Sequence, residues 1–223
     1  MRQTFFTLIT LISSLFVLGQ GDTITQIDTT NLILSKAYHS GLYEKVLNIY
    51  RSGTKDLRAY PDSTLKQIGN SYYLKNKFDS ARLFFVESIK DKKQVDNNFL
   101  VKTYANIGLV ERSLGNYDSA LSYFRESISL IDSSLDFNPY NIYDNVGNFF
   151  YYEGSYDSAI FYLSKSIQYC SRQFGKKTSR LINPYNTLAN IYLKTGKLNM
   201  AYEVASKCLS LVENDSSIKS IKK

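Results

Sequence analysis

One segment of this chain recurs three times at a fixed interval of 39 residues. KFDSARLFFVESI (77–89) is followed by NYDSALSYFRESI (116–128) and then by SYDSAIFYLSKSI (155–167). A period of this length is typical of arrays in which each repeat is one supersecondary unit that buries its apolar face against its neighbours. The interval therefore indicates a stacked array, and it sets the frame in which every other residue is interpreted.

Each copy reads as a helix, a tight turn and a second helix. First helices are expected at 65–75, 104–114, 143–153 and 185–195, where apolar residues recur at helical spacing. Each is expected to stop at a residue that tolerates the left-handed conformation: Asn76, Gly115, Gly154 and Gly196. A small residue follows the second apolar position of each first helix and predicts a close approach of the neighbouring helix: Gly69, Gly108, Gly147 and Ala189.

The series apolar-x2-apolar-Gly-x2-Tyr, followed by Ala-x3-Phe, resembles the tetratricopeptide repeat, a helix-turn-helix unit of about 34 residues. Four copies begin near Asp62, Val101, Tyr140 and Ile182, and a degenerate copy precedes them. The resemblance implies an all-α fold, a right-handed α-solenoid of about five repeats with a concave groove lined by first helices. The array is expected over 27–213, with a degenerate repeat at 27–60 and repeats at 61–95, 100–135, 139–172 and 182–213.

The first 19 residues differ from the rest and predict a secretory signal peptide, with a short leader at 20–26 after it. The apolar run from Phe5 to Leu18 has 14 residues, short of the roughly 20 that span a bilayer, so an uncleaved anchor is the weaker alternative. No cysteine stands directly after the run, where it could carry a lipid. We therefore expect a periplasmic or secreted bacterial protein that is not a lipoprotein and has no integral membrane segment after signal removal.

Charge and reactive residues argue against several function classes. The formal charge of +7 comes from scattered Lys and Arg and from a basic tail at 214–223, so nucleic-acid binding is not expected. His39 has no recognisable catalytic or metal-binding neighbours, and we predict no enzymatic activity, no catalytic residue, no metal and no cofactor. Cys170 and Cys208 are expected to be small apolar helix residues, with a disulfide between them left open.

A binding face is predicted about 100° around each first helix from its apolar stripe. Asparagine repeated at one position of this face offers donors and acceptors to a peptide backbone, and tyrosine adds apolar area with a polar tip. The predicted partner-binding residues are Lys66, Asn70, Tyr73, Lys102, Asn106, Asn141, Asn145, Asn148, Tyr152 and Asn190. Some family members clamp a terminal carboxylate here with Lys and Arg, but Asn141 and Asn145 stand at two of those positions, so that activity is not expected.

These features favour an exported, non-enzymatic interaction scaffold that binds a peptide or a partner's helix in the groove. Two alternatives remain: the extracytoplasmic sensing arm of a longer signalling protein, and a glycan-binding module, against which the lack of Trp counts. The last helix, Met200 to Val212, has apolar residues and no capping helix after it, which adds the prediction of a homodimer through that helix.

Overall fold

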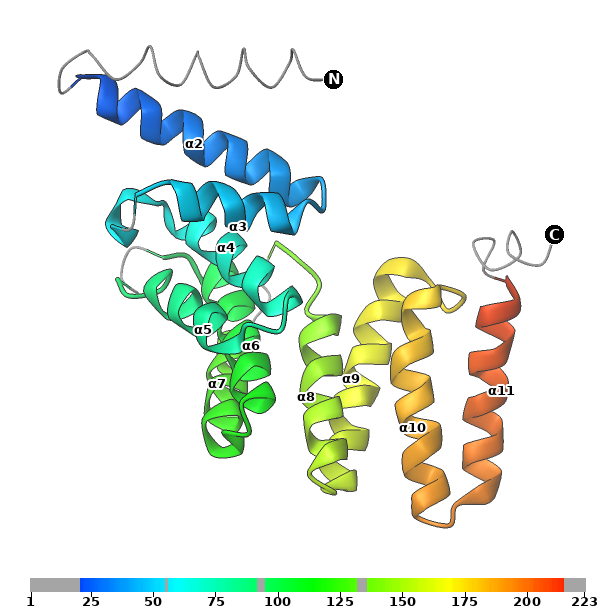
Figure 1. Cartoon of the computed structure of the whole chain (residues 1–223). Coiled ribbons are helices and arrows are strands. Elements are labelled where there is room, and N and C mark those ends of the chain that lie inside the picture. The colour runs from blue at the N-terminus through cyan, green and yellow to red at the C-terminus, as the bar shows by residue number, and fades with distance from the viewer. Residues whose placement is uncertain (1–20, 55, 92–94, 132–135, 215–223) are drawn as a thin grey trace. The chain divides into compact units, whose positions relative to one another are not determined.

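The computed structural model describes residues 21–54, 56–91, 95–131 and 136–214, and within these ranges the chain is all-α (Figure 1). The described residues form ten α-helices and two short 3-10 helices, and no strand. The all-α class predicted from the repeat is thus confirmed. The predicted signal peptide at 1–19 and residues 215–223 of the basic tail lie outside the described residues.

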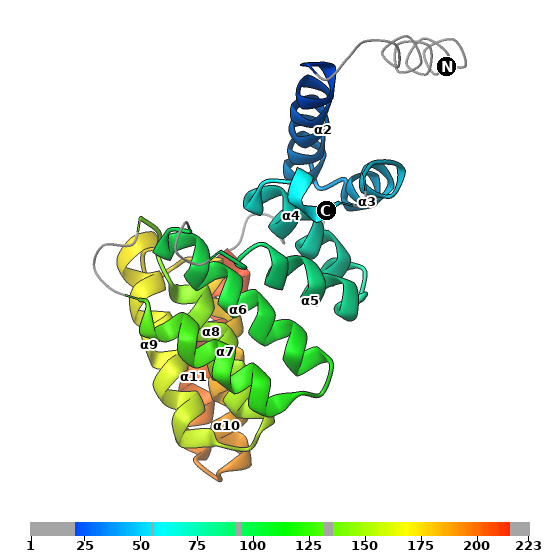
Figure 2. The same ribbon diagram turned by 90° about the vertical axis from the view of Figure 1, so that its left-hand side faces the viewer.

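The helices pair into consecutive hairpins that belong to two compact units. Unit 1 contains α2 (Gly21–His39), α3 (Tyr43–Ser52), α4 (Asp62–Leu74) and α5 (Phe78–Glu87), with the 3-10 helix η1 (Leu57–Ala59) between its hairpins. Unit 2 contains α6 (Asn97–Ser113), α7 (Tyr117–Ser129), α8 (Tyr140–Tyr152), α9 (Tyr156–Phe174), η3 (Ser179–Leu181), α10 (Ile182–Lys194) and α11 (Leu198–Asn214). Figure 2 shows α6 and α7 running side by side as one such pair.

The observed helices extend the predicted ones at their amino ends. The first helices α4, α8 and α10 begin three residues before the expected starts, and α6 begins at Asn97, seven residues early. α2 begins at Gly21, inside the stretch predicted as a leader. In α6, Asp96 accepts a hydrogen bond from the Phe99 N–H and caps the helix, so the added turns have a local cause.

The turn inside each hairpin has one repeated geometry. Asn76, Gly115, Gly154 and Gly196 have positive φ angles of 55°, 82°, 75° and 72°, as the sequence predicts. The N–H of the next residue then donates to the carbonyl five residues back, for example from Lys77 to Tyr72 at 3.0 Å. This is the Schellman arrangement, which satisfies carbonyls that the helix end leaves open. It fixes the same exit angle after α4, α6, α8 and α10.

The small residue in each first helix lets the paired second helix approach closely. A Cβ built on Gly108 would lie 2.7 Å from the ring of Phe124, and one on Gly147 would lie 2.7 Å from Leu163 Cγ. Phe124 and Leu163 are fully buried. The predicted reason for these glycines is therefore confirmed: the space of their missing side chains is filled by the large residue of the partner helix.

Successive hairpins within unit 2 bury their apolar faces against one another. Val146 and Phe149 of α8 pack with Ala120 and Phe124 of α7. In the same way Leu188 and Ile191 of α10 pack with Ala159 and Leu163 of α9. The first helix of each hairpin thus covers the second helix of the hairpin before it, as a stacked array requires.

A few residues depart from the repeat without breaking it. Glu111 occupies an apolar position of α6, is 2% exposed and accepts a hydrogen bond from Asn116 Nδ2 at 2.8 Å. Cys170 and Cys208 are free thiols, and the Cys208 thiol donates to the Ile182 carbonyl at 3.7 Å. Among the described residues, no helix is long and apolar enough to cross a bilayer.

Candidate interaction face of the first helices

Four positions on each first helix of unit 2 share one side, because residues at i, i+4, i+7 and i+11 fall on one helical stripe. We call this stripe on α6, α8 and α10 the first-helix face. Its residues are Lys102, Asn106, Leu109 and Ser113 on α6, Asn141, Asn145, Asn148 and Tyr152 on α8, and Asn183, Thr187, Asn190 and Lys194 on α10. Seven of the ten predicted partner-binding residues lie on it.

The other three predicted residues, Lys66, Asn70 and Tyr73, lie on α4 in unit 1. Asn70 Nδ2 donates to the Tyr38 hydroxyl at 2.9 Å, which ties α4 to α2. The Tyr73 ring contacts Phe78 with a centroid separation of 5.7 Å. Asn70 therefore connects two first helices. The sequence pattern predicted it as a partner-binding residue, because the pattern alone does not distinguish such a structural role from binding.

Asn148 has a similar connecting role in unit 2. Its Nδ2 donates to the Asp144 carbonyl at 2.9 Å, and its Oδ1 accepts from the Thr187 hydroxyl at 2.8 Å. The second bond joins α8 to α10 across the first-helix face. It also brings Thr187, which is absent from the predicted set, onto this face as a buried residue.

The asparagines occupy two helical positions and not one. Asn106 and Asn145 precede the core residue of their helix, whereas Asn70, Asn148 and Asn190 follow the small residue. Among the described residues, Asn141, Asn145 and Asn190 make no side-chain hydrogen bond with another part of the chain. Asn145 and Asn190 are nevertheless half-buried. Asn183, which lies on the same face but outside the predicted set, also makes no side-chain hydrogen bond with another described residue.

Asp144 is a functional candidate that the predicted set does not contain. It lies on α8 three residues after Asn141, and its Oδ1 is buried with no hydrogen-bond partner among the described residues. Burial raises the pKa of this carboxyl from 3.8 to about 6, and the nearby amide of Asn148 opposes the shift only in part. A charged residue interrupting a run of asparagines, where α4 has Lys66 and α10 has Asn186, is the sequence signal that could have found it.

Cations and tyrosines pair at the end of the face next to the hairpin turns. The Arg112 guanidinium lies 5.6 Å from the centroid of the Tyr152 ring, and Lys194 Nζ lies 5.1 Å from that of Tyr151. Tyr152 is 72% exposed. At the other end, Lys102 Nζ lies 4.1 Å over the Phe137 ring. Arg112 and Tyr151 are absent from the predicted set, because only the structure shows which aromatic each cation meets.

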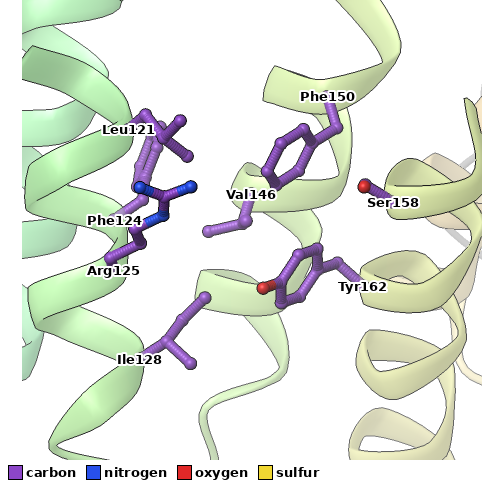
Figure 3. Close-up of a pocket in the computed structure, with 8 residues that line it drawn as sticks. All are labelled: Leu121, Phe124, Arg125, Ile128, Val146, Phe150, Ser158 and Tyr162. Atoms are coloured by element: carbon purple, nitrogen blue, oxygen red, sulfur yellow. The ribbon is translucent and has the colours of Figure 1, made fainter. Parts of the chain in front are cut away.

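A pocket of about 250 Å³ lies between α7, α8 and α9 (Figure 3). Leu121, Phe124, Arg125 and Ile128 of α7 face Val146 and Phe150 of α8 and Ser158 and Tyr162 of α9. The Phe150 and Tyr162 rings stack with centroids 5.5 Å apart and planes 4° apart. Five of the eight lining residues are apolar, and Arg125, Ser158 and Tyr162 add polar groups, so the pocket is a mixed polar and apolar gap between neighbouring hairpins.

No residue in the described ranges belongs to a group of three or more His, Cys, Asp or Glu side chains that could hold a metal ion. His39 lies near the end of α2 in unit 1, where its Nδ1 is 2.7 Å from the Ser35 carbonyl oxygen. The first-helix face has amide, ammonium and phenol side chains, which are groups suited to polar contacts along a surface.

Comparison with known proteins supports this interpretation of the fold. The family model described as tetratricopeptide repeat matches residues 101–133 and 182–215. No curated protein sequence matches the chain. The crystal structure of BtubC from P. vanneervenii is similar with a TM-score of 0.62 and 14% identity, over 86% of this chain and 73% of that one. The crystal structure of MamA is similar with a TM-score of 0.61 and 19% identity, over 86% of this chain and 98% of that one. At these identities the likeness concerns the fold alone. The family match identifies tetratricopeptide repeats at residues 101–133 and 182–215, and the hairpin geometry of unit 2 agrees with it.

Proposed function

We propose that this protein is an exported, non-enzymatic interaction scaffold that holds a peptide or a helix of a partner protein on the first-helix face of unit 2. Tetratricopeptide repeats and the chain's structural likeness to BtubC and MamA support a protein-binding role. The observation that carries the proposal is the set of half-buried amides without partners, Asn145 and Asn190, on adjacent first helices. These two amides make no hydrogen bond that stabilises the described chain, so their donors and acceptors are available to a partner.

The amides suit a peptide backbone. Each carboxamide has two N–H donors and one carbonyl acceptor, so it can pair with a peptide N–H and C=O together. The Asn148–Thr187 bond holds α8 and α10 at a fixed spacing, so Asn145 and Asn190 are presented by helices that are already in place. A prearranged face loses less conformational entropy when it binds.

The charges of the face favour an acidic segment. Lys102 and Lys194 stand at opposite ends of the face, and Arg112 lies beside the Tyr152 ring, whereas Oδ1 of the Asp144 carboxyl is buried. Arg112 and Lys194 lie close to the tyrosine rings, beside the exposed ring of Tyr152. A partner with acidic residues near both ends and a polar or apolar centre would complement this distribution.

A titration of single variants tests the face. Once a partner is captured from the cell envelope and identified, Asn145→Ala and Asn190→Ala should each weaken its binding about fivefold, the equivalent of about 1 kcal/mol. Tyr152→Ala should weaken it about tenfold or more, because an exposed aromatic at an interface is a frequent hot spot. Asn199→Ala is the matched control, since Asn199 is an exposed asparagine on α11. Unchanged affinity across all three face variants would exclude this face as the site.

Export is tested separately. Residues 1–30 fused to a reporter enzyme that folds only outside the cytoplasm should give activity, and the recovered chain should begin near residue 20. An inactive fusion would remove export from the proposal and leave the binding face intact.

A further inference from the structure

The last described hairpin of unit 2 exposes an apolar stripe. On α11, Leu198 is 65% exposed, Tyr202 78% and Leu209 59%, and Leu193 at the end of α10 is 56% exposed. Ala205 lies between Tyr202 and Leu209 on the same side, because residues spaced by three and four share a helix face. We call these five residues the terminal face.

The same five positions are covered in the hairpin before it. Forty-two residues earlier stand Tyr151, Tyr156, Ile160, Leu163 and Ile167. These residues pack against Leu188, Ile191 and Tyr192 of α10, and Leu163 is fully buried. The terminal face is thus built like an internal junction of the array, and the element that covers the equivalent surface is the first helix of a repeat.

Each first helix has one apolar position that packs in the array, and in one described first helix, α2, this position is exposed. Ile68, Ile107, Val146 and Leu188 occupy it in α4, α6, α8 and α10, and each is at most 5% exposed. The equivalent residue of α2 is Ile33, which is 44% exposed, and its neighbour Leu32 is 54% exposed. α2 therefore presents the side of a first helix that elsewhere packs on a preceding hairpin.

We propose that α2 of a second copy of this chain packs on the terminal face, so that the contact between copies repeats an internal junction. Ile33 of one copy then lies over Tyr202, Ala205 and Leu209 of the next, as Val146 lies over Leu121, Phe124 and Ile128 in Figure 3. Ala205 is smaller than Phe124 and Leu163, its equivalents, and this leaves room for the bulky pair Leu32 and Ile33.

The association is reversible and weaker than an internal junction. Lys36 of α2 stands where Val110, Phe149 and Ile191, all at most 2% exposed, stand in other first helices. A lysine at that position keeps its ammonium group in water and buries less apolar area. The two surfaces are also different from each other, so the interface is heterologous and each copy can bind two others.

Sedimentation equilibrium of the full chain over a range of concentrations tests the proposal. The weight-average mass should rise with concentration and pass that of a dimer. Tyr202→Glu and Ile33→Glu should each hold the mass at one chain. When these two variants are mixed, one intact α2 and one intact terminal face remain, and a complex of two chains should form and grow no further.

Matched controls are Leu83→Glu on α5 and Phe161→Glu on α9. These residues are 55% and 54% exposed at one equivalent position of two second helices that carry neither α2 nor the terminal face, and their variants should associate like the parent. Circular dichroism and thermal unfolding should show each variant folded, and Leu32→Lys and Leu209→Lys replace any variant that is not.

Three results would overturn the proposal. The parent chain could stay a single chain at every concentration. Ile33→Glu could associate like the parent while Tyr202→Glu does not, which would indicate pairing of two α11 helices in a symmetric homodimer. Both variants could associate like the parent, which would place the contact elsewhere in the chain.

Discussion

The hairpins α8–α9 and α10–α11 of unit 2 share the same repeat positions, but the apolar residues at these positions are packed in the first hairpin and exposed in the second. In the first, Gly147 lies against Leu163, and Ile160 and Ile167 are covered by α10. In the second, Ala189 stands at the position of Gly147 and Ala205 at that of Leu163, and Tyr202 and Leu209 are exposed. The comparison teaches that the repeat motif fixes the fold of a hairpin, whereas the next element along the array decides which of its apolar residues form a core.

The largest expected difference concerns one apolar side chain in each hairpin. Leu163→Ala should lower the free energy of unfolding by about 2 to 5 kcal/mol, because it opens a cavity in a fully buried site. Leu209→Ala on α11 should change it by less than about 0.5 kcal/mol, because that side chain is 59% exposed. Denaturant titration measures both. Similar losses at the two positions would show that α11 is covered in solution.

The glycine of the first hairpin offers a second contrast. Gly147→Ala should lower the free energy of unfolding by about 1 to 3 kcal/mol, since the new Cβ would lie 2.7 Å from Leu163 Cγ. In the double variant with Leu163→Ala the two losses should not add, because the atom that clashes is gone. Ala189→Gly in the second hairpin should lower it by about 1 kcal/mol through helix propensity alone. Denaturant titration of the two single variants and the double variant measures this. Additive losses of unfolding free energy would mean that Gly147 is not required by its contact with Leu163.

A third contrast lies on the first helices of the same two hairpins. The pKa of Asp144 is raised from 3.8 to about 6, so the folded chain keeps a proton that the unfolded chain releases between these values. Its contribution to stability is therefore full below about pH 4 and is lost as the pH rises through about 6. Asp144→Asn should raise the free energy of unfolding at pH 7 by at most about 2 kcal/mol and leave it nearly unchanged at pH 4.

The control for Asp144 is the equivalent position on α10. Asn186 is exposed, so Asn186→Asp should titrate near the ordinary value of an aspartate and add little pH dependence. Thermal unfolding from pH 4 to pH 8 compares the two variants. A parent chain whose stability profile matches that of Asp144→Asn would contradict the raised pKa.

The smallest expected effect concerns the bond that joins the two hairpins. Thr187→Val removes the hydroxyl that donates to Asn148 Oδ1 at 2.8 Å and should lower the free energy of unfolding by about 1 kcal/mol. Tyr38→Phe, which removes the corresponding acceptor of Asn70 in unit 1, should have an effect of similar size. Urea titration of both variants checks this, and no loss in either would mean that water replaces these bonds.

Much of the fold could be predicted because its signals are local. Residues such as Gly115 and Gly154 mark helix ends through backbone conformation, and the spacing of Gly147 and Leu163 within one hairpin already indicates their contact. The hydrogen bonding of the first-helix face could be predicted only in part. Asn70 and Asn148 resemble Asn145 and Asn190 in sequence, yet they bond to Tyr38 and Thr187, which lie on neighbouring helices 32 and 39 residues away.

The sequence by itself determined the period, the hairpins, their turns and the small-to-large contact inside each pair, because each depends on residues that are close along one helix or across one turn. The tertiary structure decided which asparagines bond to other helices, why the pKa of Asp144 is raised, and which apolar residues of α2 and α11 stay exposed. Burial and hydrogen bonding of these groups depend on the helices packed against them, and one helical motif can be buried in one hairpin and exposed in the next.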